Sequence, residues 1–330
     1  MYYVLAALLG SLITLTYGVN SRLSSIAGPL VATVVIHVSG LVGISLLSLV
    51  KREPRQPGRL PAWLYLGGLV GVGTVLTGNY AFLALPASLA VALALLGQSI
   101  SSIAVDASGL LGRRRYPLTA HRIPGIALAA AGAAVLAGTA GFGKSTAAAM
   151  LAALAAGALP TLSVLLNSEL GRRKGLLYST RMNYIVGLAT SAVVLLAARP
   201  PAAASVHAVF SAGPFLALAG GLMGVGIVTT FSAVFARMPA LSATLIVFCG
   251  QALTGVGFDL VREGALDVRK LLGTLLVLGG LGLNALLGRR REPGAVGAAE
   301  SAEALEAAEA LEPLEPRAAQ APAEPSPPTP

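Results

Sequence analysis

Two glutamine and two aspartate side chains stand at matching places in otherwise apolar stretches of the chain. Gln98 is followed by Ser102 and Asp106 at i+4 and i+8, so these three side chains form one polar stripe along a helix. Gln251 and Asp259 repeat the spacing of Gln98 and Asp106. An amide at membrane depth needs hydrogen-bond partners because hydrocarbon offers none. We therefore expect these amides either to contact a transported substrate or to join helices through hydrogen bonds.

The two aspartates are expected to end helices, where a carboxylate opposes the helix dipole and needs another reason to be present. Bases follow both positions: Arg113, Arg114, Arg115 and Arg122 after Asp106, and Arg262, Arg269 and Lys270 after Asp259. One interpretation is a matched pair of gates, with one ionic cluster at each membrane face, broken alternately. The other is two static salt bridges that anchor helix ends.

Further polar side chains are expected inside the membrane. His37 lies about a third of the way along its expected helix, and Tyr184 occupies the matching place later in the chain. A histidine there could relay protons, although a neutral hydrogen-bonded ring is the simpler alternative. Thr14 and Tyr17 share one stripe of the first helix, and Asn79 lies near the end of the third. The substrate-binding candidates are Gln98, Gln251, Ser102, Thr14, Tyr17, His37, Tyr184 and Asn79.

Long apolar runs must position these groups. The chain is 55% hydrophobic and only 11% charged, whereas a soluble domain carries roughly 25% charged residues. This excludes an ordinary soluble enzyme and a disordered protein. Runs of about 20 apolar residues can each cross a ~30 Å hydrocarbon core, so we predict an all-α integral membrane protein. The ten expected spans are 2–20, 29–50, 62–83, 86–108, 122–139, 146–168, 178–198, 212–233, 239–260 and 269–288.

The basic residues indicate how the chain is oriented. Sixteen lysines and arginines fall in loops on one expected side of the membrane and six on the other, which predicts that both termini are cytoplasmic. The net charge of +9 is thereby explained without nucleic acid. The single cysteine, Cys249, allows no disulfide within the chain. Residues 292–330 are rich in Ala, Glu and Pro and are expected to form a disordered cytoplasmic tail.

An internal repeat relates the two halves. The segment 67–73 recurs at 220–226, and at the same offset of 153 Gln98 meets Gln251 and Asp106 meets Asp259. The earlier parts align at 147 and the last parts at 148. We divide the chain into repeats 1–139 and 146–291, joined by an external linker, 140–145. Five helices per repeat imply inverted topology, the architecture of secondary transporters. Both copies carry a Gly-x-x-x-Gly pattern suited to close helix packing, formed by Gly67, Gly71, Gly220 and Gly224.

This arrangement resembles the drug/metabolite transporter (DMT) superfamily. The segments 28–33, 67–71 and 97–106 resemble its branch of bacterial inner-membrane exporters called YdcZ-like, here as two fused copies. The resemblance implies an inner (cytoplasmic) membrane location, export and coupling to protons. The glutamate that small multidrug carriers of the superfamily use in their first helix is missing, because residues 1–51 contain no acid.

We therefore predict a secondary active transporter that exports a small metabolite or drug-like compound by alternating access. The alternatives are a channel or passive facilitator, and a non-transporting scaffold, on the same fold. We expect no enzyme, cofactor or metal site. Residues 138–145 match a P-loop pattern, but we do not expect them to bind a nucleotide. The segment joins two expected membrane helices, whereas a P-loop joins a strand to a helix. The expected partners are a small-molecule substrate and the lipid bilayer, without nucleic acid or nucleotide, and the oligomeric state stays open.

Overall fold

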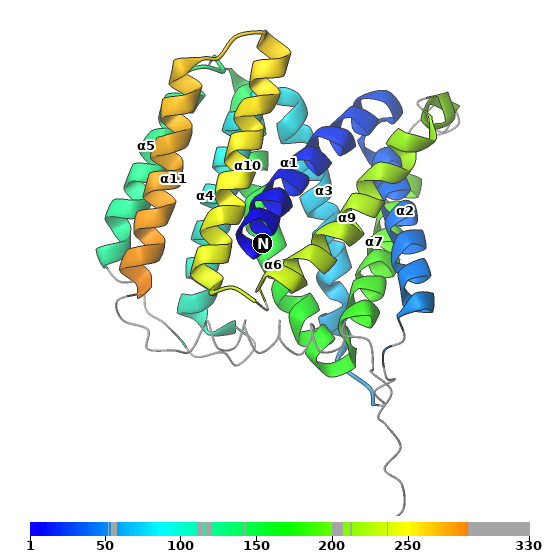
Figure 1. The fold of residues 1–330 in the computed structure, drawn as a ribbon. Coiled ribbons are helices and arrows are strands. Elements are labelled where there is room, and N and C mark those ends of the chain that lie inside the picture. Colours follow the sequence, from blue (N-terminus) through cyan, green and yellow to red (C-terminus); the bar gives the residue numbers. More distant parts are fainter. Residues whose placement is uncertain are drawn as a thin grey trace, which may run out of the picture.

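Ten apolar helices account for nearly the whole described chain, and together they confirm the predicted all-α membrane fold. The computed structural model describes residues 1–51, 53, 58–110, 115, 120–141, 143–199, 207–211, 213–235 and 237–289. The predicted tail, 292–330, lies outside the described residues. Figure 1 shows the helices as one bundle. They are α1 (Tyr2–Ala27), α2 (Pro29–Val50), α3 (Gly67–Ala84, preceded by the 3-10 turn η1, Ala62–Leu66), α4 (Ala87–Ser108), α5 (Ile123–Ala137, preceded by η3, Ala120–Arg122), α6 (Lys144–Lys174), α7 (Leu176–Ala198), α9 (Pro214–Phe235), α10 (Ala240–Glu263) and α11 (Val268–Arg289).

Two helices run longer than predicted. α1 continues to Ala27, past the expected end at residue 20, and α6 continues to Lys174, past residue 168. Serine hydroxyls at the end of α1 bond to carbonyls of the preceding turn, so these polar residues are satisfied within the helix. Both helices stop at a glycine with positive φ, Gly28 at 79° and Gly175 at 100°. That backbone conformation suits glycine and turns the chain directly into the next helix.

Each half of the chain packs against the other through equivalent helices. α1 packs against α9 and α10, and correspondingly α6 packs against α3 and α4. α2 contacts α9 just as α7 contacts α3, while α2–α7, α4–α10 and α5–α11 are each pairs of repeat-related helices. In Figure 1, α4, α5, α10 and α11 form one side of the bundle, and α2, α7 and α9 form the other. This pairing fits two related repeats; their exact boundaries and the inverted orientation stay predictions.

Repeat-related residues make equivalent contacts across the interface between the halves. A methyl group on Gly220 would lie 1.9 Å from Asn20 Oδ1, and one on Gly67 would lie 2.2 Å from Asn167 Oδ1. The predicted packing glycines Gly67 and Gly220 therefore face asparagine side chains of the opposite half. Gly71 has a looser contact with Asn183, and Gly224 lies beside the Tyr184 hydroxyl. Glycine at these points leaves room for a polar side chain to enter the interface.

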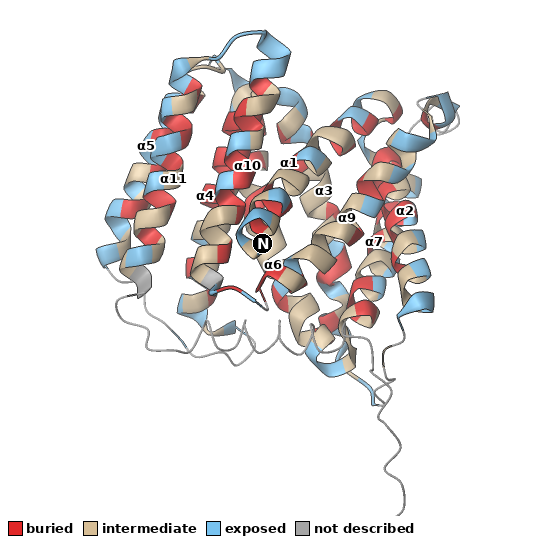
Figure 2. Ribbon diagram, in the orientation of Figure 1, coloured by how far each residue is buried: buried red, intermediate tan, exposed pale blue. Residues whose placement is uncertain are grey.

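The bundle buries small and branched residues and exposes a wide apolar surface. α4 is the most buried of the ten spans and packs in the largest core cluster with parts of α3, α5, α6, α10 and α11. Figure 2 shows the buried residues concentrated between helices and the exposed ones on their outer faces. Large exposed apolar residues include Leu151, Val193, Leu196 and Phe215. A surface of this kind is suited to lipid.

Two ends of the bundle are distinguished below by the connections they carry. The α10–α11 end lies at the top of Figure 1, and the α6–α7 end lies at the bottom. α4 begins at the α10–α11 end, where α10 finishes, and α7 begins at the α6–α7 end, where α2 finishes. The distribution of basic loops predicts that the α6–α7 end is cytoplasmic.

Candidate functional site

A buried carboxylate joins the two halves at the α10–α11 end. Asp259, near the end of α10, is 2% exposed. Its carboxylate accepts hydrogen bonds from the backbone N–H of Ala87 at 2.7 Å and of Ser88 at 3.0 Å, and from the Ser88 hydroxyl at 2.5 Å. α4 has no side-chain cap of its own, since Pro86 precedes it. Asp259 of the second half therefore caps a helix of the first, where the dipole favours negative charge.

A lysine completes this site. Lys270 of α11 is 4% exposed, and its Nζ lies 3.7 Å from Asp259 Oδ2. The ammonium also contacts the carboxylate of Glu263, which is partly open to the surface. Asp259, Ser88, Lys270 and Glu263 thus form a charged cluster at one end of the bundle, which we call the Asp259 cluster. Buried charges in such a setting are stabilised only while they remain paired.

A second carboxylate contact crosses between the halves at the opposite end. Glu53, which follows α2, accepts hydrogen bonds from the backbone N–H of Leu177 at 2.8 Å and of Tyr178 at 3.1 Å. α7 begins after Gly175 and has no side-chain cap from its own sequence. A residue of the first half therefore caps a helix of the second, and the sense of the contact is the reverse of that at Asp259. Lys174 Nζ donates to the Gly58 carbonyl at 2.7 Å nearby.

Sequence reasoning missed Glu53. It stands among bases in a loop, where it resembles an ordinary surface charge. The available signal was indirect, because α7 starts with Gly-Leu-Leu and offers no capping side chain of its own. Asp106 is the repeat counterpart of Asp259 and the predicted gate at this end. Its Oδ2 lies 3.9 Å from Arg122 Nη1 of the same half, and its side chain is 35% exposed. The gate assignments of Asp106 and Asp259 stay predictions.

His37 and Tyr184 pair across the interface between α2 and α7. Their rings meet edge to face with centroids 6.1 Å apart. Each ring lies against a glycine of the other helix, His37 on Gly187 and Tyr184 on Gly40. His37 Nδ1 lies 2.7 Å from the Thr33 carbonyl oxygen, which fixes the proton on that nitrogen, and the Tyr184 hydroxyl donates to the Gly221 carbonyl at 3.3 Å. These contacts describe a packed helix pair, and the proton-relay role of His37 stays a prediction.

The remaining polar candidates fall into two groups. Thr14 and Asn79 are buried and bonded: the Thr14 hydroxyl donates to the Gln251 carbonyl at 3.1 Å, and Asn79 Nδ2 donates to the Ser24 hydroxyl at 3.0 Å. In the part of the chain that the structure describes, the side-chain amides of Gln98 and Gln251 and the Tyr17 hydroxyl make no hydrogen bond, which leaves them available to a ligand. Ser102 is half-buried on α4, one turn beyond Gln98.

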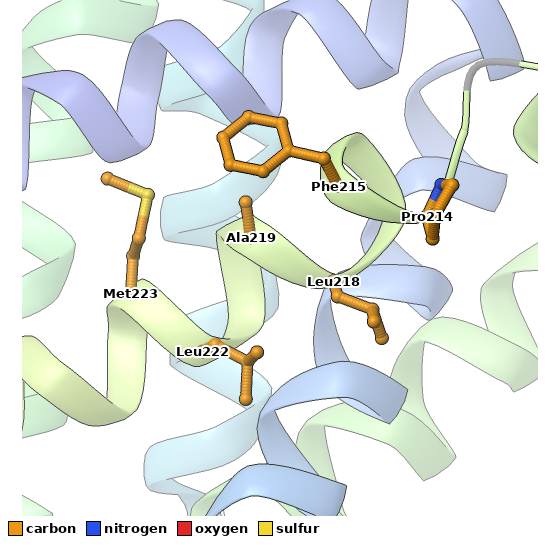
Figure 3. A pocket seen from close by; sticks show the side chains of 6 residues that line it. All are labelled: Pro214, Phe215, Leu218, Ala219, Leu222 and Met223. Carbon is orange, nitrogen blue, oxygen red and sulfur yellow. The ribbon is translucent and has the colours of Figure 1, made fainter.

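Two hollows differ in character. One is an open apolar hollow on α9 whose lining side chains are drawn in Figure 3: Pro214, Phe215, Leu218, Ala219, Leu222 and Met223. They offer no charged or hydrogen-bonding side chain, so this face is suited to lipid. The other is a small space of about 10 Å³ among α1, α3, α4 and α6, lined by Tyr17, Gly78, Ala81, Phe82, Ala90, Val91, Ala94, Ala153 and Ala156. Among the described residues, no group of three or more His, Cys, Asp or Glu side chains could hold a metal ion.

Comparisons with known proteins agree with this architecture. The model of a family described as "Putative inner membrane exporter, YdcZ" matches residues 1–135 and again residues 148–283. A solved chain, described only as a crystal structure of a protein, is similar over 87% of this chain and 99% of its own length, with 20% identity and a TM-score of 0.54. At that identity the likeness concerns the fold alone. No curated protein matches the sequence.

Proposed function

The chain belongs to the YdcZ family of inner membrane exporters of the DMT superfamily, and we propose that it is a secondary active transporter working by alternating access. Its substrate would be a small metabolite or drug-like compound. The two matched segments correspond to the two halves, as in transporters whose substrate lies between repeats that rock against each other.

The observation that carries the proposal is the pair of carboxylate caps that cross between the halves at opposite ends. Asp259 of the second half holds the start of α4, and Glu53 of the first half holds the start of α7. Rocking would separate one pair while the other stays formed. Both pairs are formed here, and the hollow beside Tyr17, which residues of both halves line, has a volume of about 10 Å³. This arrangement fits a closed state. We propose Asp259 and Glu53 as the two gates, with Asp106 as a local anchor.

Transport itself can be measured with the purified protein. A panel of metabolites and drug-like compounds is first tested for ligands that raise the unfolding temperature, because a ligand of the folded state stabilises it. We expect a ligand found in this way to be accumulated above equilibrium by proteoliposomes under an imposed pH gradient. Accumulation that depends on the pH gradient would support coupling of transport to protons, which the family resemblance implies. Equilibration without accumulation would identify a passive facilitator, and binding without flux would identify a scaffold.

The contact between Glu53 and the start of α7, at the end predicted to be cytoplasmic, gives a separate prediction. Glu53→Gln removes a charged cap, which is worth about 1 kcal/mol and so roughly a fivefold change in the open population. We expect maleimide to label the buried cysteine of Ser179→Cys several-fold faster in this variant, in a Cys249→Ser background. The matched control is Glu169→Gln, because Glu169 pairs with Arg172 and Arg173 of its own helix. Equal labelling in Glu53→Gln and Glu169→Gln would remove Glu53 from the gate.

A further inference from the structure

The small space between α1, α3, α4 and α6 is lined by two aromatic rings and by small residues. Six of its nine lining residues are glycine or alanine, and two of the others are the aromatic residues Tyr17 and Phe82. The rings of Tyr17 and Phe82 stack with centroids 6.3 Å apart, and Phe258 meets Phe82 edge-on at 5.4 Å. The other lining residues are therefore small, with Val91 the largest of them. The present volume of about 10 Å³ holds at most about one water molecule.

The equivalent place in the other half is filled. By the repeat offsets, Gly78 corresponds to Phe231, Ala81 to Val234, Ala94 to Val247 and Ala156 to Leu9. Leu9, Val234 and Val247 pack in one buried cluster together with Phe235, the counterpart of Phe82. The same helix arrangement therefore accepts large side chains at these positions. Ala90 and Ala153, by contrast, correspond to alanines, Ala243 and Ala6. At four of the six glycine and alanine positions the small residue is therefore a feature of this site and is not required by the fold.

The space is placed where rocking would enlarge it. Ala153 and Ala156 belong to α6 of the second half, while the other lining residues belong to α1, α3 and α4 of the first half. Movement of one half against the other would move α6 away from the stacked rings. A space that is nearly closed in the resting arrangement would then admit a ligand from one membrane face.

We propose that this space is the substrate site and that it takes an uncharged planar ring compound with a polar edge. The inference rests on the proposed transport function and names its substrate class. Two stacked aromatic rings in a lining otherwise made of glycine, alanine and one valine favour a planar ligand. None of the nine lining residues is charged, and an unpaired charge there would be costly. The Tyr17 hydroxyl lacks a hydrogen-bond partner among the described residues and would meet the polar edge.

Gln98 offers a second polar contact. It lies four residues beyond Ala94 on α4, so its side chain lies on the same face of the helix, one turn away. Its half-buried amide also lacks a hydrogen-bond partner among the described residues. An amide both donates and accepts hydrogen bonds, so a ring N–H or a ring hydroxyl would each be satisfied.

The test compares three compounds that share one ring. Indole is uncharged, tryptamine is its cationic relative and indole-3-acetate its anionic one. We expect indole to raise the unfolding temperature of the full-length protein in detergent, and the two charged relatives to leave it unchanged at the same concentrations. Tyr17→Phe should weaken the indole response by roughly tenfold, since one hydrogen bond to the ligand is lost. Stronger stabilisation by either charged relative would overturn the substrate class.

Substitutions that fill the space with a larger side chain distinguish a ligand-binding site from a packing defect. Ala156→Leu installs the residue that its repeat partner carries and should abolish the indole response, and Ala94→Val is a smaller change with the same purpose. Ala148→Leu, at an exposed position of the same helix, is the matched control and should keep the response. If the Ala156→Leu protein were more stable and still responded to indole, the space would be a packing defect and not the binding site. Indole binding that is lost on filling, without flux in proteoliposomes, would keep this site and reject the transport proposal.

Discussion

Replacing Asp259 by alanine is expected to lower the free energy of unfolding by about 3–5 kcal/mol, which is roughly 10 °C in unfolding temperature for a chain of this size. The carboxylate accepts from three donors at the start of α4 and lies 3.7 Å from Lys270. All of these groups lose their acceptor together. Lys270, only 4% exposed, would keep the half-exposed Glu263 as its one acidic partner among the residues that the structure describes. Thermal unfolding of the purified variant measures the effect.

Two comparison variants identify the cause of that loss. Asp106→Ala removes the repeat-related acid, which is 35% exposed and 3.9 Å from its arginine, so about 1 kcal/mol or less is expected. Adding Lys270→Met to Asp259→Ala removes the stranded ammonium and should restore part of the stability. Equal losses for Asp259→Ala and Asp106→Ala would contradict a special role for the Asp259 cluster. A double variant no more stable than Asp259→Ala would assign the loss to the α4 cap alone.

The sequence predicts the helices and their repeat because both depend on local patterns. Hydropathy alone finds ten spans, and the YdcZ family match confirms the resemblance drawn from segments such as 97–106. The ends of α1 and α6 are harder to predict, because Asn20 and Ser21 resemble a loop but lie inside a helix. The Ser21 hydroxyl donates to the Gly18 carbonyl of the same helix, and the Asn20 side chain packs against Gly220 of the opposite half. Average hydropathy along the chain contains neither contact.

The contacts of the candidate site depend on residues far apart in the chain. Asp259 caps residues 171 and 172 positions earlier, and Glu53 caps residues 124 and 125 positions later. No spacing pattern links such pairs. The alignment of the repeats, however, already contained the contrast of Ala156 with Leu9 and of Gly78 with Phe231. Differences between repeat-related residues, and not only the matches, would have pointed to the space beside Tyr17.

Two tightly packed glycines of α6 and α1 give the last prediction. A methyl group on Gly157 of α6 would lie 1.7 Å from the Ala94 carbonyl oxygen of α4, and one on its repeat partner Gly10 would lie 2.1 Å from that of Val247. A backbone oxygen cannot move without its helix, so Gly157→Ala must push α6 away from α4. We expect a loss of about 3 kcal/mol or more in unfolding free energy, measured by thermal unfolding, and a similar loss for Gly10→Ala.

The control is a glycine with open space around it. Gly282 lies inside α11, and a methyl group there would meet no atom within 4 Å. Gly282→Ala should therefore be neutral or stabilise the helix by up to about 1 kcal/mol, because alanine is the better helix former. If Gly157→Ala and Gly282→Ala had the same effect, α4 and α6 would not be in backbone contact. If Gly157→Ala alone is costly, the two halves meet through a backbone seam at α4–α6, and any rocking that opens the space beside Tyr17 must begin by parting it.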